Sequence, residues 1–236
     1  MTTAKPARAR SVDLTGRSAI DDKRQLSEKV AMYVRERIMI GEFHADDFLR
    51  TERLAEQLGV SATPVREALM LLHSEGSVRW EPRRGYRIVP LTQQDVSDLF
   101  EVQAHIAGEL AARAAEVLDE NEIARLEDIQ TKLEQAAKDG QAALVDEYNH
   151  EIHRTINKAS NSTRMRSLLS LTVQYVPLNY FGTIEGWAQA SAHDHSAIFT
   201  ALRGRDPETA RAVMSDHIRH IGELLTEHLR KEGNLS

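Results

Sequence analysis

The sequence predicts a mainly α-helical chain of two modules: a shorter N-terminal one with a small β-hairpin, and a longer all-helical one after it. Three observations predict this. The 236 residues are too many for one small domain and sufficient for two. Before residue 91, two short helical segments joined by a glycine precede a hairpin with arginines at its tip. From there on, glycine and proline become rare and helical periodicity is nearly unbroken.

Composition excludes several classes of protein. Hydrophobic residues make up 41% and charged residues 28% of the chain, so a globular core is expected. The absence of cysteine excludes disulfides and thiolate chemistry and fits a reducing cytoplasm. The chain has no run of about 18 apolar residues, so no membrane-spanning helix is predicted. Residues 1–91 carry 16 Lys and Arg against 13 Asp and Glu, whereas residues 92–236 carry 14 against 23. The net charge is therefore +3 in the front half and −9 in the back half, which favours two modules with different partners.

The N-terminal segment is predicted to be an arm followed by one helix. Residues 1–24 are basic and polar with no apolar stretch behind them, which predicts a disordered arm and not a secretion signal. A helix is predicted over residues 25–40, because every fourth residue is apolar: Leu26, Val30, Val34 and Ile38. Ser27 is placed to cap a slightly later start, and Gly41 to end the helix.

Two short helices with a tight turn are predicted next. Thr51 can cap a helix over residues 52–58, and Gly59 suits the left-handed conformation that ends one. Ser61 or Thr63 can cap a second helix that runs to about residue 74, with Pro64 in its first turn. This pattern is typical of a helix-turn-helix.

A β-hairpin is predicted after the second helix. Residues 78–80 and 86–89 read as strands around the tip Pro82-Arg83-Arg84-Gly85. Arginines at such a tip can meet phosphate or a narrow minor groove, and glycine allows a close backbone approach. Together the elements over residues 25–91 predict a winged helix-turn-helix.

The stretch LAEQLGVSATPVREALMLLHSEG followed by PRRGYRIVP resembles the DNA-binding domain of the GntR family of transcription regulators. In that family the start of the recognition helix and the wing tip touch DNA. The resemblance therefore implies contacts from Ser61, Thr63, Arg66, Arg83, Arg84 and Gly85. Hydroxyls at a helix N-terminus can bind phosphate, and Arg66 can reach a base edge. Ala62 stands where the family commonly has arginine, which leaves the operator sequence open.

The back half predicts a bundle of about six helices. Start signals are Asp119 or Asn121, Asn161 or Ser162, and Asp206-Pro207; breaks are Gly140, Gly182 and Gly204. The predicted ranges are 93–117, 121–138, 141–158, 161–181, 185–203 and 207–231.

This half, residues 92–232, resembles the FCD domain, the effector-binding and dimerisation half of the FadR-type branch of GntR regulators. The matching stretches are HRTINKASNS from His153 and HSAIFTALRGRDPETARAVMSDHI from His195. The short link into the bundle and six helices are similar to the VanR-like subgroup.

The FCD resemblance implies a divalent metal site. Many FCD domains bind a metal through an aspartate and three histidines; the matching positions are Asn149, His153, His195 and His217. Residues four apart share one helix face, so Asn149 and His153 can meet one ion. Neutral imidazoles suit a divalent transition metal, with zinc or nickel as the preferred candidates. Without the resemblance, no spacing rule excludes His150, His193 or His220.

The effector is less determined. Many relatives have arginine and glutamate at the positions of Gln103 and Ala107, where arginine would suit a carboxylate. A small-molecule effector therefore remains open between an organic acid and a less charged compound, and a purely structural metal is an alternative. Aromatic residues are candidates either for lining a pocket or for core packing: Tyr175, Tyr180, Phe181 and Trp187.

The resemblance implies a cytoplasmic homodimeric repressor that binds a near-palindromic operator in double-stranded DNA. The alternative of a metal-dependent enzyme is disfavoured. His150 and His153 are three apart with Glu151 between them, which is not the spacing of the His-Glu-x-x-His zinc motif. No glycine-rich phosphate loop is present either.

Overall fold

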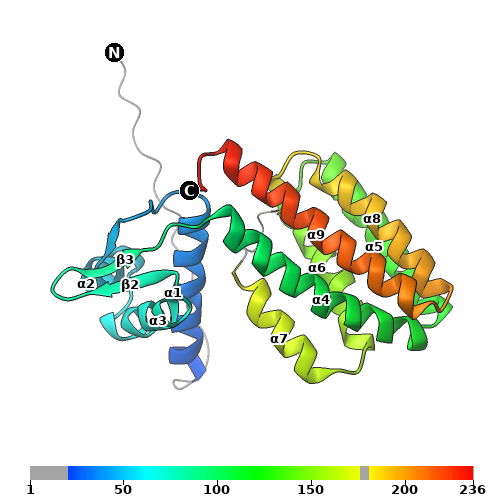
Figure 1. Cartoon of the computed structure of the whole chain (residues 1–236), viewed down its shortest axis with the longest axis horizontal. Coiled ribbons are helices and arrows are strands. Elements are labelled where there is room, and N and C mark those ends of the chain that lie inside the picture. The colour runs from blue at the N-terminus through cyan, green and yellow to red at the C-terminus, as the bar shows by residue number, and fades with distance from the viewer. Residues whose placement is uncertain (1–20, 176–180, 236) are drawn as a thin grey trace, which may run out of the picture. The chain divides into compact units, whose positions relative to one another are not determined.

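The computed structural model describes residues 21–175 and 181–235 as two compact units (Figure 1). One unit contains the chain up to Ile38 and residues 43–90; the other contains residues 39–42 and the chain from Leu91 onward. Each unit has its own hydrophobic core. Within the described ranges, no helix is both long and apolar enough to cross a membrane. Residues 1–20 of the predicted arm lie outside the described residues.

The first unit has the predicted winged helix-turn-helix architecture. Its elements are α1 (Asp21–Met39), β1 (Phe48–Leu49), α2 (Thr51–Leu58), α3 (Ala62–Ser74), β2 (Val78–Glu81) and β3 (Gly85–Ile88). The strands form an antiparallel sheet in the order β1-β3-β2. Side chains alternate along β3, so Tyr86 and Ile88 point into the core. Gly59 adopts the left-handed conformation that ends α2, as predicted.

An ion pair joins α1 to the end of α3. Arg35 donates two hydrogen bonds to the Glu75 carboxylate, at 2.6 and 3.0 Å, and both side chains are largely buried. Two parallel hydrogen bonds between a guanidinium and a carboxylate fix the relative orientation of the two groups as well as their distance. The pair therefore constrains how the end of α3 packs on α1.

The second unit is a bundle of six α-helices and a short 3-10 turn. Its elements are α4 (Gln93–Val117), α5 (Glu120–Lys138), α6 (Ala142–Ala159), α7 (Thr163–Val173), η1 (Phe181–Thr183), α8 (Trp187–Arg203) and α9 (Pro207–Lys231). Capping boxes begin α4 at Thr92 and α5 at Asp119. Both starts lie within one residue of the prediction.

Small residues let α4 and α9 approach closely along the bundle (Figure 1). A Cβ on Gly108 of α4 would lie 2.9 Å from the Arg211 carbonyl oxygen, and one on Gly222 of α9 would meet the Phe100 ring. Several buried alanines of α4 face the same core. The close pairing leaves the other side of α4 to α6, α7 and α8.

Three predictions of helix ends were wrong. Ser27 lies inside α1, because that helix already begins at Asp21; residues 21–24 of the predicted arm are therefore helical. Thr51 is the first residue of α2 and not its cap. The helix predicted over residues 161–181 is also too long, since α7 ends at Val173. A helix that continued to Pro177 would bring the proline ring against the Val173 carbonyl.

Candidate metal centre, effector cavity and DNA interface

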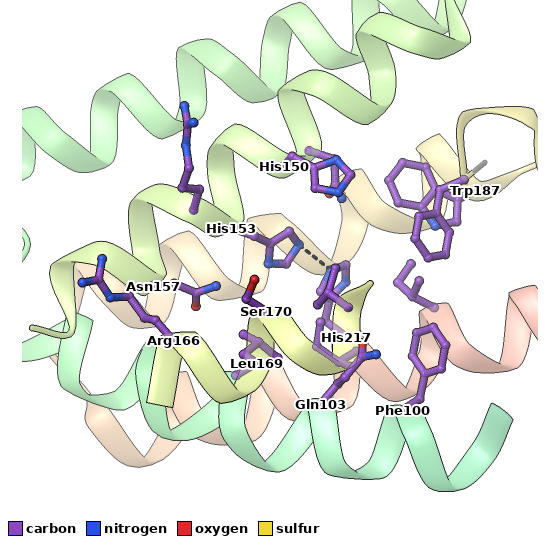
Figure 2. A pocket seen from close by; sticks show the side chains of 17 residues that line it. Phe100, Gln103, His150, His153, Asn157, Arg166, Leu169, Ser170, Trp187 and His217 are labelled. Atoms are coloured by element: carbon purple, nitrogen blue, oxygen red, sulfur yellow. Dashed lines mark hydrogen bonds between the residues drawn. The ribbon is translucent and has the colours of Figure 1, made fainter. Parts of the chain in front are cut away.

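Three helices of the second unit bring three histidines together. His153 comes from α6, His195 from α8 and His217 from α9. Their ring centroids are 4.8 to 5.3 Å apart, and one nitrogen of each lies within 4.8 Å of the others. The Nε2 atoms of His153 and His217 face each other at 3.2 Å (Figure 2). Because His195 and His217 are buried, this cluster lies inside the bundle and not on its surface.

The far nitrogens of two of these rings are already held. His195 Nδ1 lies 2.7 Å from Gln130 Oε1 on α5, and His217 Nδ1 lies 3.2 Å from Asp194 Oδ2 on α8. An oxygen acceptor requires the hydrogen to be on Nδ1, which leaves Nε2 with a free lone pair. Both rings are therefore in the tautomer that a metal ligand needs, with the outer acceptor that metal-bound histidines usually have.

Burial keeps the cluster uncharged. It lowers the pKa of His153 and His195 well below the usual histidine value, and the neighbouring imidazoles lower it further. Burial also lowers the pKa of His217, although its hydrogen bond to Asp194 opposes that effect. Neutral imidazoles retain the lone pairs that bind a metal ion.

The other candidate ligands differ in their surroundings. Asn149 lies one helical turn before His153 in the same cavity wall, and its buried Oδ1 has no hydrogen-bond partner. His150 also lines the cavity, but its Nδ1 is hydrogen-bonded to the Asp146 carbonyl. His220 is not part of the three-ring cluster; its Nδ1 lies 2.8 Å from Asp194 Oδ2.

A cavity of about 370 Å³ opens beside the cluster (Figure 2). His153, His217 and Asn149 line one part of it, and Gln103 and Ala107 of α4 line another. Its volume lies within the range of small-molecule sites. Of the aromatic pocket candidates, Phe181 and Trp187 line the cavity, Tyr175 does not, and Tyr180 lies outside the described residues.

In the first unit, the start of α3 is exposed. Ser61 stands at the N-cap position with extended backbone, and its hydroxyl makes no capping hydrogen bond. Thr63 and Arg66 follow on the exposed face, where Met70 is 59% exposed. The recognition-helix candidates therefore share one accessible surface, with the Ser61 hydroxyl free of a capping role.

The wing tip is a tight turn. The Arg84 N–H donates to the Glu81 carbonyl at 3.2 Å, and Arg83 has φ 65°, unusual for a residue other than glycine. Arg84 is exposed and its guanidinium lies 4.1 Å above the Phe48 ring. Gly85 has a structural role, since a Cβ there would lie 2.6 Å from the Leu49 carbonyl oxygen.

Sequence reasoning did not identify two groups of residues. Gln130 is far from His195 in the sequence, and Asp194 has no recognisable motif spacing to His217. Only the fold therefore reveals these two partners. Asn157 and Arg166 also line the cavity. Asn157 could have been found, because Asn149, His153 and Asn157 are spaced by four on one helix face.

Comparisons with known proteins agree with both units. Residues 26–88 match the family model for bacterial regulatory proteins of the gntR family, and residues 98–220 match the FCD domain. The uncharacterized HTH-type transcriptional regulator YdhC of Bacillus subtilis is 26% identical over 201 residues, covering 83% of this chain and 88% of that protein. A probable D-xylose utilization operon transcriptional repressor of Paenarthrobacter nicotinovorans is 26% identical over 177 residues, covering 72% and 75%.

Among solved structures, Escherichia coli McbR/YncC superposes with a TM-score of 0.65 at 24% identity, covering 86% of this chain and 98% of that one. This likeness supports the fold. Transcription regulators of this kind are DNA-binding proteins and not enzymes, and FCD domains bind small-molecule effectors. The chain therefore belongs to the GntR family, carries the FCD domain, and is a DNA-binding transcription regulator that responds to a ligand.

Proposed function

We propose that this regulator holds a divalent transition metal, zinc or nickel, at His153, His195 and His217, with Asn149 as the fourth protein ligand. The observation that carries the proposal is the convergence of three neutral imidazoles on one point inside the bundle. The unpartnered Oδ1 of Asn149 in the same cavity wall supports it, because a buried polar atom without a partner is rare and costly.

The four proposed ligand atoms are chemically suited to a divalent transition metal. Imidazole nitrogens with one amide oxygen suit a borderline cation such as zinc or nickel. When bound, the metal would supply positive charge and open coordination positions for an oxygen donor of the effector. Gln130 and Asp194 orient His195 and His217 toward the proposed ion.

For DNA binding, we propose that α3 enters the major groove while the wing tip follows the neighbouring backbone or minor groove. Ser61 and Thr63 would bind phosphate, and Arg66 would read a base edge. The wing would contribute the exposed arginines Arg83 and Arg84, with Gly85 setting the turn beside them.

A homodimer would present two such DNA-binding domains to the half-sites of a near-palindromic operator in the bacterial cytoplasm. An effector that binds one arrangement of the two bundles more tightly would change the spacing of the two DNA-binding domains. Repression is the proposed mode, supported by the P. nicotinovorans relative, which is described as a repressor.

The metal site is tested by elemental analysis of purified protein. We expect one zinc or nickel ion per chain in the wild type and a loss of metal in His153→Ala. The control is His105→Ala, because His105 is an exposed histidine of α4. Equal metal contents in the wild type and His153→Ala would refute the site.

The DNA interface is tested by selecting an operator from a random DNA pool and measuring specific binding at physiological salt. Arg66→Ala should lower specific affinity about tenfold to hundredfold, since a bidentate base contact is worth about 1–3 kcal/mol. Arg125→Ala, at an exposed arginine of α5, is the control. If Arg66→Ala kept the wild-type ratio of specific to non-specific affinity, Arg66 would not be a reading residue.

A further inference from the structure

The exposed face of α3 changes in chemistry along the helix. Its first turns expose Thr63, Arg66 and Glu67, whereas its second half exposes the apolar side chains of Met70 and Leu71. No lysine or arginine follows Arg66 in this helix. Because cationic side chains are the main partners of DNA phosphate, the second half of α3 is poorly suited to contacts with the DNA backbone.

The polar side chains in that second half already have partners. His73 Nδ1 lies 3.0 Å from the Val78 carbonyl oxygen, at the start of β2. The Ser74 hydroxyl donates a hydrogen bond of 2.7 Å to the Leu71 carbonyl. What this half of α3 offers to a partner is therefore mainly apolar surface.

Exposed apolar side chains of the first unit gather on the elements of the DNA-binding motif. Within the described part of that unit, the large apolar side chains that are exposed are Met70, Leu71 and Trp80, and all three belong to α3 and β2. Single exposed apolar residues are ordinary on a protein surface, whereas a group of them on one side indicates a contact area. Met70 is the most exposed of the three, at 59%.

Met70 lies in the middle of the exposed face of α3. At about 100° per residue, its direction on the helix is about 20° from that of Thr63 and about 40° from that of Arg66. The buried residues Val65 and Leu72 point to the opposite side. A duplex that contacts Thr63 and Arg66 therefore also contacts Met70.

The chemistry of the methionine side chain selects one base. A thioether has no hydrogen to donate and is a weak acceptor, so it gives the polar base edges no partner. The apolar group that the major groove presents is the C5 methyl of thymine. The flexible methionine chain adapts its shape to such a small apolar surface.

The spacing along α3 predicts where that thymine lies. Met70 is four residues beyond Arg66, which corresponds to about 6 Å of helix rise. Successive base pairs are about 3.4 Å apart along the duplex. The thymine is therefore expected within about two base pairs of the base that Arg66 contacts, on either strand.

We infer that Met70 is a specificity-determining residue that contacts a thymine methyl group in the major groove, beside the base read by Arg66. The inference rests on the proposed DNA interface of α3. The two side chains then recognise neighbouring positions by different chemistry, Arg66 through charged hydrogen bonds and Met70 through an apolar contact. Since Met70 neutralises no phosphate, its contribution is independent of salt concentration.

The test removes the methyl group alone. In an operator selected from a random DNA pool, each thymidine of one half-site is replaced in turn by deoxyuridine, which pairs in the same way and lacks only the C5 methyl. Competition binding measures specific affinity at physiological salt. For the wild type we expect one position, within two base pairs of the Arg66-dependent base, at which deoxyuridine lowers affinity about threefold to tenfold.

Variants at position 70 assign that effect. Met70→Ala should bind the thymidine and deoxyuridine duplexes about equally, because the apolar contact is already lost. Met70→Leu should keep the preference for thymidine, whereas Met70→Gln, of similar length but polar, should lose it. The matched control is Val117→Ala, at an exposed apolar residue of α4, which should keep the wild-type preference. Thermal unfolding of each variant establishes that the fold is intact.

Three results would overturn the inference. They are an operator with no methyl-sensitive thymidine near the Arg66-dependent base, a deoxyuridine penalty in Met70→Ala as large as in the wild type, and a methyl preference retained by Met70→Gln. In the second case Met70 would contact another part of the DNA or a protein partner. The proposed role of Arg66 is judged separately, by the specificity of Arg66→Ala on the unmodified operator, so each assignment can fail while the other stands.

Discussion

The residue that most distinguishes the proposed metal site is Asn149, because the FCD resemblance implies an aspartate at its position. Its Oδ1 is buried and unpartnered, and it lines the same cavity as His153 and His217. An amide oxygen can bind a cation, but it does not bring the negative charge that a carboxylate brings.

Asn149→Asp should therefore raise zinc affinity, by about tenfold or more, since about 1.4 kcal/mol of added attraction corresponds to a factor of ten. Competition with a chromophoric chelator measures the change. Asn157→Asp adds the same charge two turns further along α6 and should alter zinc affinity much less. A zinc affinity unchanged in Asn149→Asp would mean that residue 149 is not a ligand.

Gln130 acts through His195. It accepts a 2.7 Å hydrogen bond from Nδ1, and both side chains are buried. Gln130→Ala should lower zinc affinity about tenfold to hundredfold, the usual cost of losing an outer partner of a metal-bound histidine. The matched control is Gln135→Ala, on the exposed face of α5. Recovery of affinity in Gln130→Glu, which restores an acceptor, would separate positioning from packing; a failure to recover would favour packing.

At the scale of elements, a single carboxylate links α6 to the turn that precedes α8. Asp146 Oδ1 accepts a 3.0 Å hydrogen bond from the Gly182 N–H, while its Oδ2 is buried without a partner. Burial raises the pKa of Asp146 above its usual value, although the Gly182 hydrogen bond opposes this. The ionised carboxylate is thus less favourable in the folded protein than in the unfolded chain.

Because the folded-state pKa is raised, Asp146 contributes stability at low pH, and that contribution is lost as pH rises through the folded pKa. The Asp146→Asn variant keeps an acceptor for the Gly182 N–H and carries no charge at this position. The free energy of unfolding of Asp146→Asn relative to wild type should therefore increase from pH 4 to pH 7.5. Urea denaturation across this range measures it, and a difference that falls with pH would contradict the assignment.

Arg83 in the wing turn has both an unusual backbone conformation and an exposed side chain. Arg83 sits at φ 65°, a region that glycine occupies without steric cost, and its side chain is exposed. Arg83→Gly should leave the free energy of unfolding unchanged or raise it by up to about 1 kcal/mol, while DNA affinity falls and its salt dependence weakens. Chemical denaturation and operator binding measure the two effects. A variant that lost stability and kept DNA affinity would make Arg83 structural.

At the scale of the whole molecule, the two units have separate cores, and the proposed metal centre and the cavity use residues of the second unit alone. A fragment of residues 91–236 should therefore fold cooperatively and bind zinc with nearly the affinity of the full chain. Circular dichroism and zinc titration test this. An unfolded fragment, or one that lost zinc binding while folded, would show that the centre needs residues before 91, which include residues 39–42 of the second unit.

Local chemistry in the sequence was sufficient for most of the fold. Helical periodicity and the Asp206-Pro207 start signal act within a few residues, so the ends of α4 and α9 agree with the prediction. The errors arose where local signals compete: Thr51 and Ser27 can cap a helix but here lie inside one, and helical periodicity continues up to Pro177, a residue that breaks helices.

The sequence by itself determined the family, the architecture and the three histidines, because these depend on residue type and order along the chain. Only the tertiary structure decided what those histidines touch, since Gln130 of α5 is brought to His195 and Asp194 of α8 to His217. It also decided that Gly85 is required by the Leu49 carbonyl. Such contacts depend on how helices and strands pack, and a pattern of spacing along one chain does not contain that information.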